Sequence, residues 1–144
     1  MAQDIQLQVA SAKEQYQQDE PIVIRVMLWN FGEDPQVFNS RLALNNENGP
    51  GEISFKIIGP SGQTLPFRAR VNIGSPEQED FAWVLPWNSI GRQYELEPQA
   101  EFDLRKKGKY QLVARYTNRQ KGEAWSHQAW VGTLTSNPIT FEVK

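Results

Sequence analysis

Five tryptophans are the residues whose type and spacing give this sequence its clearest candidate chemistry. Exposed indole rings stack on sugar rings, and tryptophan and tyrosine also anchor protein interfaces. Four of the five form two pairs that are close in the chain, Trp83 with Trp87 and Trp125 with Trp130. We therefore take Trp83, Trp87, Trp125 and Trp130 as the candidate ligand-binding residues.

Core packing is the alternative role for these rings. In an extended segment, Trp83 and Trp87 lie on the same face, whereas Trp125 and Trp130 lie on opposite faces. Most of the tryptophans are expected to fill a core, where a large aromatic side chain buries about 150 Å² or more. Polar neighbours in the chain predict that at least one of Trp87, Trp125 and Trp130 remains exposed.

Nucleophilic catalysis has little support in the sequence. The chain contains no cysteine, and its only histidine, His127, is not accompanied by a Gly-x-Ser-x-Gly nucleophile elbow. The usual zinc sites draw on several cysteines and histidines, so His127 alone does not supply one. We predict no catalytic residues, no cofactor and no metal site, and hence a protein that is not an enzyme.

Carboxylates are clustered in two places. Ser75–Asp80 offers oxygen ligands for a cation, although a solvated acidic loop is the simpler interpretation. Glu95, Glu97, Glu101 and Asp103 alternate with other residues, as outward-facing carboxylates of a strand do. Glycoside hydrolysis needs two carboxylates at a separation that only the fold can set.

Period-two alternation of apolar residues dominates the chain and predicts strands. Segment 65–73 alternates most regularly, with Leu65, Phe67, Ala69, Val71 and Ile73 on one face. No window has a helical period. The predicted strands span residues 4–10, 22–29, 37–44, 53–57, 65–73, 81–87, 109–117 and 137–143, with shorter pieces at 94–96 and 102–104 and an irregular arm at 125–134. About 8–10 short strands joined by Gly/Pro turns predict an all-β antiparallel sandwich or a barrel.

Length and charge limit the classes of partner. The 144 residues predict a single domain, 1–144. A net charge of −2 and a pI near 5.5 argue against nucleic acid, and the short apolar runs argue against a membrane span. The N-terminus has no basic and apolar leader, so the chain, taken as complete, predicts a cytoplasmic protein. We expect a monomer or a weak oligomer.

The segment Leu104–Leu112 places Gly108 two residues before Tyr110, with an apolar residue further upstream. This pattern resembles the tyrosine corner of immunoglobulin-like sandwiches, in which a tyrosine hydroxyl bonds to upstream backbone. Pro21–Pro35 and Trp130–Val143 resemble the opening strand and the closing arm of bacterial immunoglobulin-like domains. The resemblance implies an all-β, antiparallel immunoglobulin-like β-sandwich with Tyr110 at the corner. Unlike antibody domains, the chain has no cysteine pair.

The sequence predicts a non-enzymatic module that binds a protein partner through loops or an edge strand. One alternative is a carbohydrate-binding module that uses the four candidate tryptophans. A second alternative is an intracellular proteinase inhibitor, because Pro21–Pro35 also resembles the small bacterial inhibitors that have an immunoglobulin-like sandwich. An inhibitor would present a rigid exposed loop, for which Asn45–Gly51 and Ser75–Asp80 are the candidates.

Overall fold

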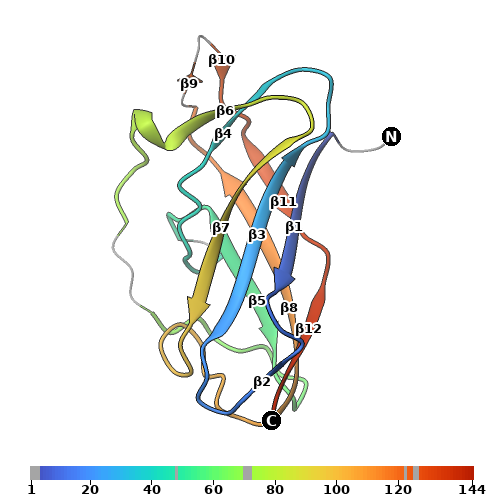
Figure 1. Ribbon diagram of the computed structural model, residues 1–144. Helices are drawn as coiled ribbons and strands as arrows, with labels where there is room; N and C mark the ends of the chain where they lie inside the picture. Colours follow the sequence, from blue (N-terminus) through green and yellow to red (C-terminus); the bar gives the residue numbers. More distant parts are fainter. Residues whose placement is uncertain (1–3, 48, 70–72, 122, 125–126) are drawn as a thin grey trace.

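The computed structural model describes residues 4–47, 49–69, 73–121, 123–124 and 127–144 (Figure 1). These residues form an all-β sandwich in which two antiparallel-dominated sheets pack face to face, as predicted. Twelve strands are present in this part of the chain, and three of them are only two residues long. No helix in this part is long and apolar enough to cross a membrane.

The first sheet has three antiparallel strands in the order β1-β3-β7. β1 spans Ile5–Ser11, β3 spans Ile22–Asn30 and β7 spans Asn88–Leu96. The central strand β3 alternates buried and partly exposed residues along its length. This burial pattern follows the period-two alternation that predicted the strand.

The second sheet is built around the long strand β8 (Gly108–Asn118). β5 (Ile53–Ile58) pairs with one edge of β8. Two strands share the other edge, β12 (Ile139–Val143) beside the first half and β11 (Gly132–Thr135) beside the second. β2 (Gln15–Tyr16) runs parallel to β12.

Smaller elements complete one end of the sandwich. β4 (Gln36–Asn39) pairs with β6 (Phe81–Val84), and β9 (Glu123–Ala124) pairs with β10 (His127–Gln128). A short 3₁₀ turn, η1 (Gln78–Asp80), leads into β6. Figure 1 shows β4, β6, β9 and β10 together at the end where β3 finishes.

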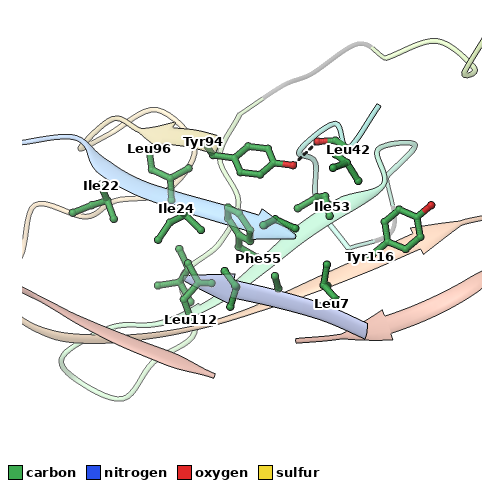
Figure 2. Packing of buried hydrophobic residues seen from close by; sticks show 14 of the residues in the cluster. Leu7, Ile22, Ile24, Leu42, Ile53, Phe55, Tyr94, Leu96, Leu112 and Tyr116 are labelled. Atoms are coloured by element: carbon green, nitrogen blue, oxygen red, sulfur yellow. Dashed lines mark hydrogen bonds between the residues drawn. The ribbon is translucent and has the colours of Figure 1, made fainter. Parts of the chain in front are cut away.

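The core lies between the inner faces of the two sheets (Figure 2). Every second residue of each sheet's central strand points into it, because side chains alternate across a strand. Each buried aliphatic or phenyl side chain contributes about 1.5–3 kcal/mol relative to an exposed one. The buried residues of the two central strands are Ile22, Ile24, Val26 and Leu28 on β3, and Tyr110, Leu112, Ala114 and Tyr116 on β8.

Tyr110 forms the hydrogen bond that the sequence pattern predicted. Its hydroxyl donates to the backbone carbonyl of Lys106, and its ring stacks on Phe141 with centroids 5.2 Å apart. Gly108 precedes it at φ +135°, where a Cβ would lie only 2.7 Å from Pro60. The local corner geometry is therefore present, while the resemblance to immunoglobulin-like domains stays a prediction.

The predicted strand 65–73 is wrong in the described residues 65–69 and 73. Leu65, Phe67 and Ala69 are partly buried and Pro66 and Arg68 are exposed, so the alternation of burial is real. Leu65 donates its N–H to the carbonyl of Ile57 in β5 (2.8 Å), but the described residues form no strand. Alternation indicates which side chains face the core, whereas a strand also needs hydrogen bonds to a neighbouring backbone. Pro66 has no N–H to donate to such a neighbour.

Two other predicted strands are shorter than expected. Segment 37–44 forms a strand only as far as Asn39, and segment 81–87 only as far as Val84. Conversely, β7 begins at Asn88, although its polar first half gave little strand signal. The exposed position of β7 explains that weak signal, because one face and one edge of the strand meet solvent.

Candidate functional site

Two turns meet at the end of the first sheet. β3 ends at Asn30 and leads into turn 31–35, while turn 85–87 connects β6 to β7. Asn30 and Asn88 are opposite each other in the β3–β7 pairing. The N–H of Trp87 donates to the carbonyl of Asn30 (2.6 Å), which joins the two turns directly.

The side chain of Asn30 holds both turns in place. It is fully buried, and its amide nitrogen donates to the carbonyls of Asp34 (2.9 Å) and Val84 (3.0 Å). Its amide oxygen accepts from the N–H of Gly32 (3.0 Å). A buried amide with all these bonds made rigidifies its surroundings, because any movement would leave polar atoms unpaired.

The β6–β7 connection has the geometry of a type II turn. Asn88 donates its N–H to the carbonyl of Leu85 (3.1 Å), Pro86 occupies the second position, and Trp87 has φ +63° at the third. Type II turns favour glycine or asparagine at this third position, since a positive φ brings Cβ close to the backbone. Tryptophan is therefore held here in a strained conformation that most side chains avoid.

Three aromatic rings form a continuous surface over these turns, which we call the aromatic tip (Trp29, Phe31 and Trp87). Trp29 and Phe31 stack with centroids 5.1 Å apart and planes 11° apart. Phe31 and Trp87 are 5.3 Å apart and inclined by 57°. Trp87 is 71% exposed, whereas the other two rings are partly buried. The tip thus presents one protruding indole that rests on a fixed aromatic base.

The surroundings of the aromatic tip are apolar and acidic. Leu85, two residues before Trp87, is 51% exposed. The charged residues of the two turns and of the adjoining start of β1 are Asp4, Glu33 and Asp34, and all three are exposed carboxylates. Phe31 donates its N–H to the carbonyl of Asp4, which brings this carboxylate residue to the tip. An aromatic centre with a charged rim is a common arrangement of protein interfaces.

The other predicted ligand-binding tryptophans do not join the tip. Trp83 lies in β6 opposite Val37 and is partly buried. Trp130 is also partly buried and stacks on Tyr116, with centroids 6.0 Å apart. Trp125 lies outside the residues that the structure describes. The prediction that Trp83 and Trp87 share a face of one extended segment is wrong, because the strand ends at Val84 and the chain then turns.

Sequence reasoning missed Trp29 and Phe31 as parts of the site. Trp29 occupies the outer face of β3, and the Asn-Phe-Gly turn that follows brings Phe31 back over it. The available signal was the placement of two aromatic residues on either side of Asn30 at a strand end. A turn residue that is buried and bonded on all sides, such as Asn30, becomes evident only from coordinates.

The two loops considered for an inhibitor are both tied to the body of the protein. In 45–51, where residue 48 is outside the described part, the Arg41 guanidinium donates to the Pro50 carbonyl (3.1 Å) and Arg115 pairs with Glu47. In Ser75–Asp80, the carbonyl of Asp80 accepts from the Ser40 side chain (2.8 Å). Nothing in these contacts selects either loop as a protease-binding segment.

The acidic loop also gives no sign of a cation site. Hydrogen bonding and repulsion between neighbouring carboxylates, Glu79 above all, raise the pKa of Glu77. Over the described part of the chain, no group of three or more histidine, cysteine, aspartate or glutamate residues is arranged to hold a metal ion. The exposed side chains of residues 77–79 agree with a solvated loop.

Comparison of the chain with protein-family models and with curated proteins finds no match to either. The aromatic tip is therefore defined by its own geometry alone.

Proposed function

We propose that this chain is a non-enzymatic protein-interaction module whose contact surface is the aromatic tip. The observation that carries the proposal is the state of Trp87, which is 71% exposed and at the same time held at φ +63°. A strained backbone conformation persists only where the surrounding structure enforces it, and such positions cluster at binding sites. Exposing a large apolar ring adds to that cost unless a partner covers it.

The partner that fits this surface is a protein with an apolar pocket and a basic rim. Trp87 and Leu85 supply adjacent apolar anchors, and tryptophan is among the residues that dominate binding energy at interfaces. The exposed residues Asp4, Glu33 and Asp34 lie just before β1 and in the turn after β3, and they add carboxylates next to Phe31 of the tip. Complementary basic charges on the partner would steer association and make its rate fall with salt.

Crosslinking from Trp87 tests the proposal. A photoreactive benzoylphenylalanine replaces Trp87 in the cells that make this protein, with the same replacement at Val131 as the matched control. Val131 is also an exposed apolar residue, at 45%, but lies outside the tip. We expect a discrete protein adduct from position 87 that position 131 does not give.

The crosslinked partner is then identified and purified, and its affinity for the protein and its variants is measured. Trp87→Gly should weaken binding by about 30-fold or more, as expected of a central anchor, whereas Val131→Ser should change it less than threefold. Absence of an adduct at position 87, or equal effects of the two substitutions, contradicts the proposal. A Trp87-dependent fluorescence change with polysaccharides, without a protein adduct, would instead assign the tip to carbohydrate.

A further inference from the structure

No described residue bonds to the backbone groups on the outer edge of strand β7. The carbonyl of Val23 accepts a hydrogen bond from the N–H of Ala12, and the N–H of Phe31 donates to the carbonyl of Asp4. The odd-numbered residues of β3 therefore direct their backbone groups toward β1. The even-numbered residues of β3 therefore face β7, and the pairing of Val26 with Arg92 makes the even-numbered residues of β7 their partners. The residues of β7 whose N–H and C=O groups point away from the sheet are Ser89, Gly91, Gln93 and Glu95.

Two other sheet edges in the described part of the chain are partly covered. On β1, the side-chain amide of Asn137 bonds to both the N–H and the carbonyl of Val9, at 3.1 Å each. On β5, Ile53 exchanges backbone hydrogen bonds with Ala43 and Asn45. No described residue makes the equivalent bonds to the outward groups of β7. An uncovered edge of this length is a template for an additional strand.

A groove of about 550 Å³ runs beside this edge. Arg92, Gln93, Tyr94 and Glu95 of β7 line one side, and the other side is mainly apolar and includes Leu44, Phe67 and Ile73. The described residues between β5 and η1, 59–69 and 73–77, pair with no strand of the sheet that contains β7. The groove therefore combines free backbone hydrogen-bonding groups with an apolar wall, which are the two requirements for binding an extended peptide.

Glu101 gives the groove an unsatisfied acidic group. Its Oε2 atom is buried and has no hydrogen-bond partner, and this burial raises the pKa of the carboxyl group. The one basic residue of β7, Arg92, is already engaged, because its guanidinium donates to the carbonyls of Arg41 and Leu42. A buried acceptor without a partner is costly, so a ligand that supplies a donor gains affinity there.

We propose that the β7 edge binds an extended segment of a partner protein as an added strand, with a lysine or arginine of that segment paired to Glu101 and apolar side chains against Phe67. A second copy of this chain fits less well. Its β7 would bring Glu95 to the same edge, while its Arg92 is held by its own loop. This surface is separate from the aromatic tip, so the inference goes beyond the proposed function.

The probe for this site is the peptide acetyl-Thr-Val-Thr-Lys-Thr-Val-Thr-amide, which places valine and lysine on one face. On binding, amide hydrogen exchange should slow at Ser89, Gly91, Gln93 and Glu95, and not at the even-numbered residues that β3 already protects. Gln93→Pro removes one outward N–H without touching the backbone bonds to β3 and should weaken binding about tenfold. The matched control, Gln93→Ala, loses the same side-chain bond from Arg25 but keeps that N–H, and it should bind like the wild type.

The charge is tested separately with Glu101→Gln. This variant should weaken the lysine peptide about tenfold and leave unchanged a peptide with norleucine at the same position. Absence of binding up to about 1 mM peptide overturns the proposal, as does equal loss for both peptides. If protection of the outward amides rises with protein concentration in the absence of peptide, the edge binds a second copy of the chain, and this result also overturns the proposal. Peptide binding should be the same in Trp87→Gly, so this test and that of the aromatic tip fail independently.

Discussion

The hydroxyl of Tyr94, on β7, donates a hydrogen bond to the carbonyl of Leu42 in the loop that follows β4 (Figure 2). Leu42 is buried and has φ +50°, a left-handed conformation that costs a non-glycine residue on the order of 1–2 kcal/mol. Arg92 donates to the same carbonyl (3.3 Å). The edge strand thus fixes the strained loop whose next residues, Ala43 and Leu44, line the β7 groove.

Tyr94→Phe should release this loop. The substitution removes one donor from a buried carbonyl while keeping the ring in the core, so the free energy of unfolding should fall by about 1–2 kcal/mol. Urea denaturation measures the loss, and limited proteolysis should show faster cleavage within residues 40–47. An unchanged unfolding midpoint together with unchanged cleavage would show that Arg92 alone suffices to hold Leu42.

Arg41 and Glu52 form a buried ion pair that ties the loop after β4 to β5. Nη2 of Arg41 lies 2.6 Å from Oε2 of Glu52, and only 4% of the Glu52 side chain is exposed. Arg41→Met leaves the carboxylate buried without its cation, so we expect a loss of about 3–5 kcal/mol. The double variant Arg41→Met/Glu52→Gln removes that charge and should lose less than Arg41→Met alone. Thermal and urea unfolding compare the three proteins, and equal losses for both variants would contradict this account.

The low pKa of Asp103 predicts a contribution to stability that depends on pH in the acid range. Hydrogen bonds from the Arg105 side chain lower the pKa of Asp103 to about 2. Because the pKa is lowered in the folded state, this contribution is present above about pH 4, the pKa of an unfolded aspartate, and is lost as the pH falls toward 2. The pair is exposed, so the effect should stay below about 1 kcal/mol. Asp103→Asn should be less stable than the wild type at pH 6, and the difference should vanish near pH 2.

The fold class was predictable because the strands that build the two sheets follow a simple rule. Residues 22–29 and 109–117 alternate in the sequence, and β3 and β8 bury those same alternate residues. Segment 65–73 follows the same rule and yet its described residues form no strand. Local pattern fixes which side chains face the core, but hydrogen-bond partners depend on which backbone lies alongside, and the sequence does not contain that information locally.

The candidate site was predictable only in part, for a similar reason. Polar and proline neighbours predicted that at least one of Trp87, Trp125 and Trp130 is exposed, and Trp87 is. The left-handed backbone of Trp87 was not predicted, because tryptophan is uncommon at a position that favours glycine. The contact of Trp87 with Phe31 depends on Asn30, which joins two turns more than fifty residues apart in the chain. Such a bridge leaves no periodic pattern in the sequence.

Substitutions at Trp87 separate the cost of the strained backbone from the contribution of the indole ring to the free energy of unfolding. Trp87→Gly and Trp87→Ala both remove the indole and its contact with Phe31, but only glycine adopts φ +63° without strain. The glycine variant should therefore unfold with a free energy about 1 kcal/mol higher than the alanine variant. Leu85 is the control, since it lies in the same turn without a positive φ, and there alanine should be the more stable of the two. Urea denaturation of the four variants tests the reversal, and the same order at both positions would show that Trp87 is not strained.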